Sequence, residues 1–142
     1  MRYEIDIHID AEPEAVWEVL SDVEHWPEWT RSMISVQRLE PGSFGAGSAV
    51  KIQQPKLSQA IYTVTEYEPG RSFTWTAKAP GVRTLASHHV APDVEDDHTT
   101  VHLAVHQSGL LAPLVGLLAA GLIRRYMTME AEGLKNRCES GG

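Results

Sequence analysis

The side chains best suited to chemistry in this sequence are its histidines, of which there are seven. His102 and His106 alternate with apolar residues, so both lie on one face of a predicted strand. His88 and His89 stand in the preceding predicted strand, and because neighbours in a strand face opposite sides, one of them shares that face. Such a group could bind zinc, or one imidazole, with a reference pKa of about 6.5, could act as a general base. No carboxylate or cysteine stands at a ligand-like spacing, so we expect no metal site and retain His89 as a candidate ligand contact.

Arg83 and several aromatic residues are further candidates for ligand contact. Arg83 begins the predicted strand that contains His89, and its guanidinium could bind a carboxylate or enolate through two hydrogen bonds, although such an arginine is more often solvated. Trp75 lies in mid-strand and Tyr126 on a helix stripe, where a phenol could orient an apolar ligand; core packing is the alternative. The candidate ligand-binding residues are Trp75, Tyr62, Arg83, His89, Leu118, Leu122 and Tyr126.

No residue pattern indicates a covalent nucleophile or a bound cofactor. The serines lack a Gly-x-Ser-x-Gly motif, and the single cysteine, Cys138, falls at the end of the last predicted helix. Gly42, Gly45 and Gly47 lie between predicted strands rather than before a helix, so they do not form a phosphate-binding loop. The sequence therefore predicts no nucleotide or other cofactor and assigns no catalytic residue.

The element that must position these residues is a long helix predicted over residues 110–138. Its apolar residues recur at steps of three or four and define one face, made of Leu111, Val115, Leu118, Leu122, Tyr126, Met129 and Gly133. No residue from Leu110 to Ile123 is charged, so we expect the remaining chain to enclose this half. The uncharged run is shorter than the about 20 residues of a membrane span. The net charge of -7 also disfavours a helix lying on anionic lipid.

The remaining chain predicts an antiparallel sheet with two short helices after its first strand. An alternating strand begins at Tyr3, Pro13 opens a first short helix, and a second short helix covers residues 23–29. Six further strands, separated by turn residues, are predicted over residues 33–40, 48–54, 59–67, 72–77, 82–90 and 99–106. An acidic turn occupies residues 92–98. The predicted fold class is α+β: a curved sheet of seven strands wrapped round the C-terminal helix.

Composition narrows the class of protein further. A chain of 142 residues is expected to form one domain, 1–142, with residues 137–142 as a frayed tail. Twelve basic residues against nineteen acidic ones argue against nucleic acid as a partner. The N-terminus alternates polar and apolar residues without a signal-peptide core, so we expect a cytoplasmic protein. The oligomeric state stays open.

In the order of its elements and in several local patterns, the chain resembles the START-like or SRPBCC superfamily, with its helix-grip fold. Within that superfamily it is most similar to the polyketide cyclase/dehydrase and lipid-transport family. The segments that carry the resemblance are residues 11–17, 22–29, 64–71, 73–75 and 108–114. The resemblance implies a largely apolar cavity between sheet and helix, which family members use to hold lipids, polyketides or other hydrophobic ligands. Some members are enzymes and others only bind, and the family shares no catalytic motif.

Three functional hypotheses follow, in order of preference. The first is a binding protein for a hydrophobic or aromatic small molecule, lipid-like or polyketide-like, held between the sheet and the C-terminal helix. The second is a cyclase/dehydratase-like enzyme acting in the same cavity, for which the available acid or base groups are His89, His102, His106, Tyr126 and Arg83. The third is an interaction protein whose cavity is filled and whose contact region is either the sheet edge or the region around Trp26 and Trp29.

Overall fold

A computed structural model of the chain describes residues 1–93 and 98–140, so most of the predicted acidic turn lies outside the described residues. The elements follow one another as β1 (Arg2–Ile9), α1 (Pro13–Ser21), the 3₁₀ helix η1 (Val23–Glu28), β2 (Ser35–Arg38), β3 (Ala49–Gln53), β4 (Ala60–Glu68), β5 (Ser72–Ala79), β6 (Val82–Pro92), β7 (Thr99–Ser108) and α2 (Ala112–Ser140). This order confirms the predicted helix-grip arrangement. Helix α2 continues to Ser140, where the sequence predicts a frayed tail from residue 137.

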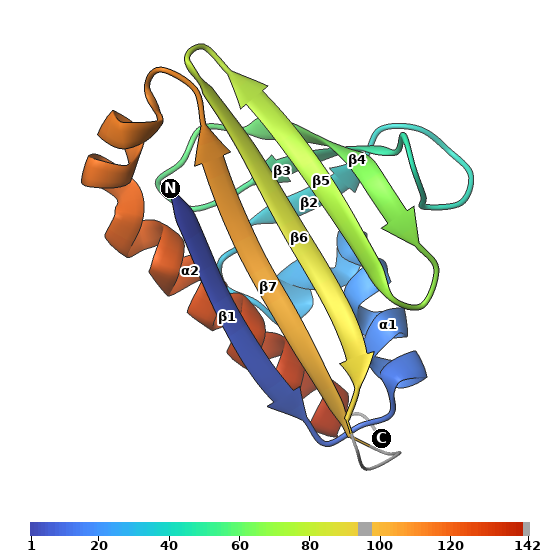
Figure 1. Cartoon of the computed structure of the whole chain (residues 1–142). Helices are drawn as coiled ribbons and strands as arrows, with labels where there is room; N and C mark the ends of the chain where they lie inside the picture. The colour runs from blue at the N-terminus through green and yellow to red at the C-terminus, as the bar shows by residue number, and fades with distance from the viewer. Residues whose placement is uncertain (94–97, 141–142) are drawn as a thin grey trace.

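The seven strands form one antiparallel sheet in the order β1-β7-β6-β5-β4-β3-β2. The first strand therefore pairs with the last and forms one edge of the sheet, and the remaining strands follow one another as a meander (Figure 1). Helix α2 crosses behind the sheet and packs against β1, β7 and α1. One face of the curved sheet is thus covered by helices, and the other faces solvent.

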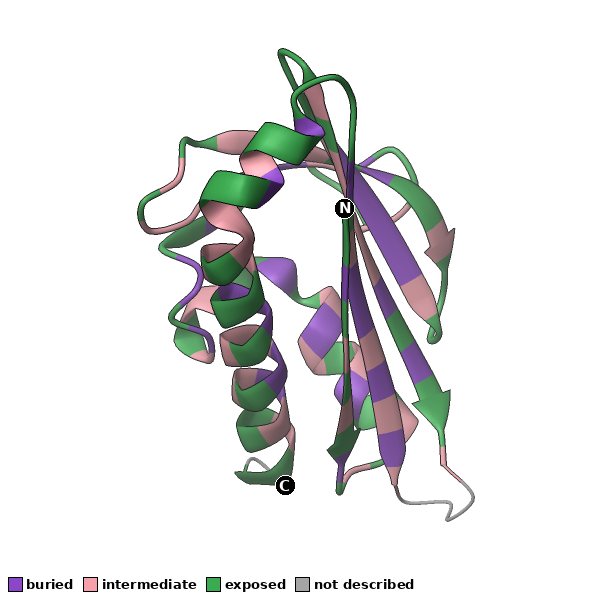
Figure 2. Ribbon diagram, turned by 60° about the vertical axis from the view of Figure 1, so that its left-hand side comes forward, coloured by how far each residue is buried: buried purple, intermediate pink, exposed green. Residues whose placement is uncertain are grey.

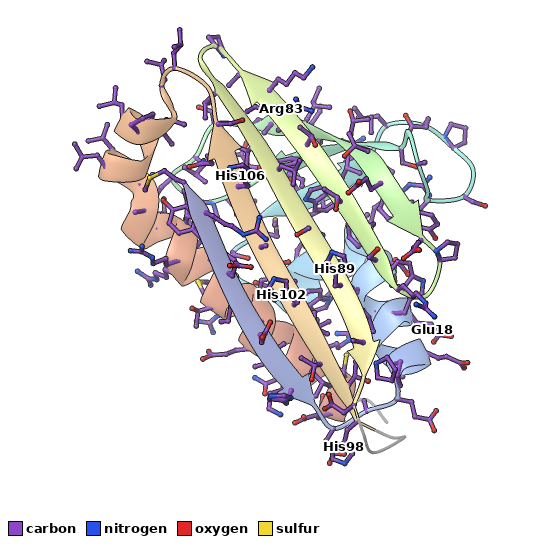
Figure 3. All side chains as sticks on the ribbon, in the orientation of Figure 1. Glu18, Arg83, His89, His98, His102 and His106 are labelled. Carbon is purple, nitrogen blue, oxygen red and sulfur yellow. The ribbon has the colours of Figure 1, made fainter. Side chains whose placement is uncertain are left out.

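The strand register assigns side chains to these two faces. Trp75 lies opposite Ala86, which lies opposite Val105, and Val105 lies opposite Tyr3. Because directly paired residues point to the same side, this row lies on the face that the helices cover, which we call the concave face. His89 and His102 belong to a row on the other side, and Figure 3 shows both on the face turned away from α2.

The core is centred on Trp26 of η1, which is fully buried. Its indole N–H donates a hydrogen bond to the Leu20 carbonyl at 3.0 Å, which fixes the ring beneath the end of α1. The ring centroids of Trp29 and Trp75 each lie 5.3 Å from that of Trp26. Two helices and the middle of the sheet therefore meet in one aromatic cluster.

The first half of α2 contradicts the prediction that the remaining chain encloses it. Leu110, Leu117 and Leu118 are 96%, 81% and 78% exposed. The buried residues of α2 are Ala112, Gly116, Tyr126, Met127, Ala131 and Leu134. In Figure 2 the helix turns an exposed side outward along its N-terminal half. The physical reason is that small residues, Ala112 and Gly116, make the inner contact, so the leucines on the other sides of the helix point to solvent. None of the helices in the described part of the chain is long and apolar enough to cross a membrane.

Candidate functional site

A carboxyl group, that of Glu130 on α2, lies within the covered side of the molecule. Its side chain is only 14% exposed, and among the described residues it makes no hydrogen bond. Desolvation by the surrounding protein disfavours the charged form and raises the pKa of Glu130 to about 8. At neutral pH this side chain is therefore mostly a protonated carboxylic acid, which can donate a hydrogen bond as well as accept one.

His88 of β6 faces this carboxyl group from the sheet. The Nδ1 atom of the buried imidazole lies 3.1 Å from the Phe73 carbonyl oxygen. Because a carbonyl can only accept, Nδ1 carries the proton and donates, which leaves the lone pair on Nε2. That Nε2 atom lies 3.7 Å from Glu130 Oε1.

Burial decides which of the two side chains carries the proton. It lowers the pKa of His88 to about 4, while that of Glu130 rises to about 8. The separation would allow an ion pair, but the cost of burying both charges keeps the pair neutral near pH 7. The site thus presents a neutral acid beside a neutral base.

Tyr62 of β4 adds a phenol to this pair. Burial raises its pKa to about 12, and the nearby Glu130 carboxylate is the second cause. Its ring centroid lies 5.7 Å from that of Trp75. A carboxyl, an imidazole and a phenol, supplied by α2, β6 and β4, therefore form one polar group, which we call the buried polar triad: Glu130, His88 and Tyr62.

Aromatic rings surround the triad. The His88 imidazole stacks on Phe73 with ring centroids 4.3 Å apart, and it meets Trp26 and Trp75 edge-on. These rings exclude water, and in such a low-dielectric setting a hydrogen bond to a ligand is stronger than in water. One helical turn before Glu130, the Tyr126 hydroxyl donates a hydrogen bond to the Pro55 carbonyl and ties α2 to the β3–β4 loop.

The concave face is less well covered beyond the triad. Ala86 and Val105 are partly exposed, although they belong to the row of Trp75 on the face that α2 covers. Ala119 and Leu122 of α2 are also partly exposed. Solvent therefore reaches apolar side chains of both the sheet and the helix in this part of the molecule.

A family model described as polyketide cyclase/dehydrase and lipid transport matches residues 1–139. The chain belongs to this family. A search of curated proteins found no significant match.

Solved structures agree with this membership at the level of the fold. An aromatase/cyclase, Zhui, from Streptomyces sp. R1128 is 17% identical, with 100% of this chain and 98% of that one covered and a TM-score of 0.78. A START superfamily protein from Mycobacterium smegmatis is 15% identical, with 99% of each chain covered and a TM-score of 0.74. Norcoclaurine synthase from Thalictrum flavum is 10% identical, with 97% and 93% covered and a TM-score of 0.74. At these identities the likeness concerns the fold alone.

Within this polyketide cyclase/dehydrase family fold, the structure separates the predicted ligand contacts into two groups. Trp75 and Tyr62 lie at the triad, whereas Tyr126 and Leu122 precede Glu130 on α2 by one and about two helical turns. Arg83 and His89 are exposed on the opposite face of the sheet (Figure 3). Leu118 points to solvent. The structure therefore brings together the aromatic part of the predicted set but not its charged part.

The exposed face of the sheet holds the remaining strand histidines. His102 lies within hydrogen-bond distance of Asp6 and of Glu4, the latter at 3.1 Å, and its ring centroid lies 6.5 Å from that of His89. His106 is exposed on the same face. In residues 1–93 and 98–140, no cluster of histidine, cysteine, aspartate or glutamate is arranged to hold a metal ion.

Two residues of the triad, His88 and Glu130, are absent from the predicted set. The sequence leaves open which of two adjacent histidines faces inward, and the prediction retains His89. For Glu130 a signal exists, since it follows Tyr126 by four residues and so lies on the same side of the helix. A glutamate beside an aromatic stripe is usually read as the start of the polar face, so this signal is weak.

Proposed function

We propose that this protein binds an apolar, neutral small molecule that carries at least one hydrogen-bonding oxygen, placed between the sheet and α2. The observation that supports this proposal is the neutral Glu130 carboxyl, which is largely but not fully enclosed, makes no hydrogen bond among the described residues and faces the lone pair of His88. Buried polar groups in folded proteins are almost always satisfied, so such a group calls for a partner. A ligand oxygen supplies one.

The chemistry of the site selects the class of ligand. Glu130 donates to a carbonyl, His88 Nε2 accepts from a hydroxyl, and Tyr62 can do either. Trp75 and the partly exposed Leu122 offer an apolar wall to the rest of the molecule. An anionic ligand is disfavoured, because Arg83, the arginine predicted to bind an acid, lies on the opposite face. A lipid-like or polyketide-like molecule with a ketone, enol or phenol fits, in agreement with the family description.

A second candidate function is acid–base catalysis on such a ligand. The observation that favours it is the pKa of Glu130, which is about 8. A general acid is most effective when its pKa lies near the working pH, and this value lies close to neutrality. Glu130 would protonate a ligand carbonyl while His88 or Tyr62 holds the adjacent oxygen, which is the chemistry of a cyclase or dehydratase. Binding that persists in Glu130→Gln while turnover disappears would support this function.

The first experiment is native mass spectrometry of the purified protein, followed by denaturing extraction of any bound molecule. The proposal expects a small, apolar, oxygen-containing mass that is lost on unfolding. An ionic or purely hydrocarbon mass would contradict it.

A fluorescent probe then tests the placement of the ligand. Prodan is a neutral naphthalene with a ketone, and we expect it to bind with an increase in fluorescence. Tyr62→Phe keeps the ring and removes one hydrogen bond, so the Kd for prodan should rise about three- to tenfold. Arg83→Ala and His89→Ala, on the other face of the sheet, should leave the Kd unchanged. If Arg83→Ala and His89→Ala raise the Kd for prodan as much as Tyr62→Phe does, the probe binds elsewhere.

A further inference from the structure

An exposed cluster of leucines covers one end of the molecule. Its members, which we call the leucine end, are Leu110, Leu111, Leu114, Leu117 and Leu118. They lie on the first turns of α2 and on the connection that leads into it, where Figure 2 shows an outward-facing exposed surface. Apolar side chains concentrated at one place on a surface mark an interaction site, whereas single exposed ones do not.

The rim of the leucine end is basic. The backbone N–H of Leu111 donates to the Gly81 carbonyl at 2.8 Å, so the β5–β6 turn touches the start of α2. Lys78 and Arg83 lie opposite each other on the two strands that flank this turn, on the face of the sheet turned away from α2. Arg124 and Arg125 follow the leucines along the helix.

Acidic residues are missing from the two segments that supply the β5–β6 turn and the start of α2, although Glu4 of β1 lies near Arg124. Residues 69–92 and 98–129 contain no aspartate or glutamate, although the whole chain has a net charge of -7. Acidic side chains lie elsewhere, as at the far end of α2, where the backbone N–H of Asp10 donates a hydrogen bond to the carboxylate of Glu139. With a rise of about 1.5 Å per residue, Glu139 lies about 30 Å from Leu118, well beyond the screening length of about 8 Å. The net charge therefore does not oppose an anionic surface at the leucine end.

We propose that the leucine end docks on a membrane surface that carries anionic lipid. Exposed leucines bordered by lysine and arginine match the pattern by which a helix inserts its apolar side chains at the lipid interface while cations contact the headgroups. A second copy of the chain fits less well, because a symmetric contact would bring two basic rims together without acidic partners. This inference does not depend on the proposed ligand.

Vesicle flotation tests the docking directly. The protein should float with vesicles of phosphatidylcholine and phosphatidylglycerol, and it should float much less with phosphatidylcholine alone or at high salt. Leu117→Gln with Leu118→Gln should reduce binding about tenfold or more, since both side chains are exposed and the fold does not need them. Lys78→Glu with Arg83→Glu should also reduce binding about tenfold.

A matched control carries the same chemical change at the other edge of the sheet. Ile34 and Leu39 flank β2 and are also exposed, so Ile34→Gln with Leu39→Gln should bind vesicles as the wild type does. The proposal fails if the wild-type protein does not float with anionic vesicles, or if it binds neutral vesicles equally well. It also fails if the Leu117→Gln/Leu118→Gln variant and the Lys78→Glu/Arg83→Glu variant both still bind. It also fails if size-exclusion chromatography shows a dimer that Leu117→Gln with Leu118→Gln dissociates and vesicles show no binding.

Discussion

Replacing Glu130 with glutamine should make the free energy of unfolding nearly independent of pH between 6.5 and 8. Over the same range the free energy of unfolding of the wild-type protein should fall by about 2 kcal/mol. The reason is the buried carboxyl group, whose pKa rises from 4.5 to about 8 on folding. Between these values the folded protein keeps a proton that the unfolded chain releases. Each pH unit therefore costs the folded state about 1.4 kcal/mol, and the loss ends once the folded carboxyl also ionises.

His88 determines how the free energy of unfolding changes with pH below 6.5. Its pKa falls from 6.5 to about 4 on folding, so below pH 6.5 the unfolded chain takes up a proton that the folded protein does not. The stability that this neutral imidazole contributes is lost as the pH falls from 6.5 to 4. Between pH 4.5 and 6.5 the two groups have opposite slopes of similar size. The wild-type protein should therefore be most stable on this plateau and less stable on both sides of it.

Urea unfolding at a series of pH values measures the profile, and Glu132→Gln is the matched control. Glu132 lies two residues along the same helix and is exposed, so its loss should leave the slope unchanged. At pH 5 the Glu130→Gln protein should differ from the wild type by less than about 1 kcal/mol, because both side chains are then largely neutral. At pH 9 it should be more stable by about 4 to 5 kcal/mol. Parallel curves for wild type and Glu130→Gln would show that the carboxylate is solvated in the folded protein.

The sequence predicts the fold well because the fold depends on patterns that one chain displays fully. The alternation in β1 and the turn residues between later strands locate every strand to within a few residues. Pro13 and the apolar spacing that follows it locate α1. The family resemblance then orders these elements, and the structure confirms that order.

The site is predicted less well, because it depends on which side of an element faces inward. Between the adjacent His88 and His89, local alternation does not decide, since residues on both sides of that strand mix apolar and small polar types. A β-bulge between Val64 and Glu66 also shifts the register of the neighbouring strand, which no periodicity reveals. The N-terminal half of α2 is apolar on every side, so its residue pattern does not indicate which side is buried. Small residues, and not the leucines, form the contact.

Gly133 should be the least replaceable position of α2, although glycine is a poor helix former. A Cβ atom at this position would lie 2.0 Å from the carbonyl oxygen of Trp29, which is backbone and cannot rotate away. Gly133→Ala therefore forces α2 away from the segment after η1, at a cost that should exceed the gain in helix propensity. We expect a net loss of about 2 kcal/mol in the free energy of unfolding.

Gly121→Ala makes the same substitution on the same helix and is the control. In the described part of the chain, no atom other than the adjoining residues and the helix's own backbone lies within 4 Å of the Cβ position at Gly121, so alanine there should stabilise the protein by about 0.5 to 1 kcal/mol. Urea unfolding compares the two variants, and stabilisation by both would show that α2 does not need a close approach at Gly133.

The Gly133→Ala substitution should also reach the buried polar triad. Gly133 follows Glu130 by three residues and so lies on the same side of the helix. A helix displaced at Gly133 admits water to the Glu130 carboxyl, and hydration lowers its pKa toward the ordinary value. The loss of stability between pH 6.5 and 8 should then become smaller in Gly133→Ala, while Gly121→Ala keeps the wild-type slope. The close contact of one glycine with a backbone carbonyl would thus maintain the neutral acid that the proposed ligand needs.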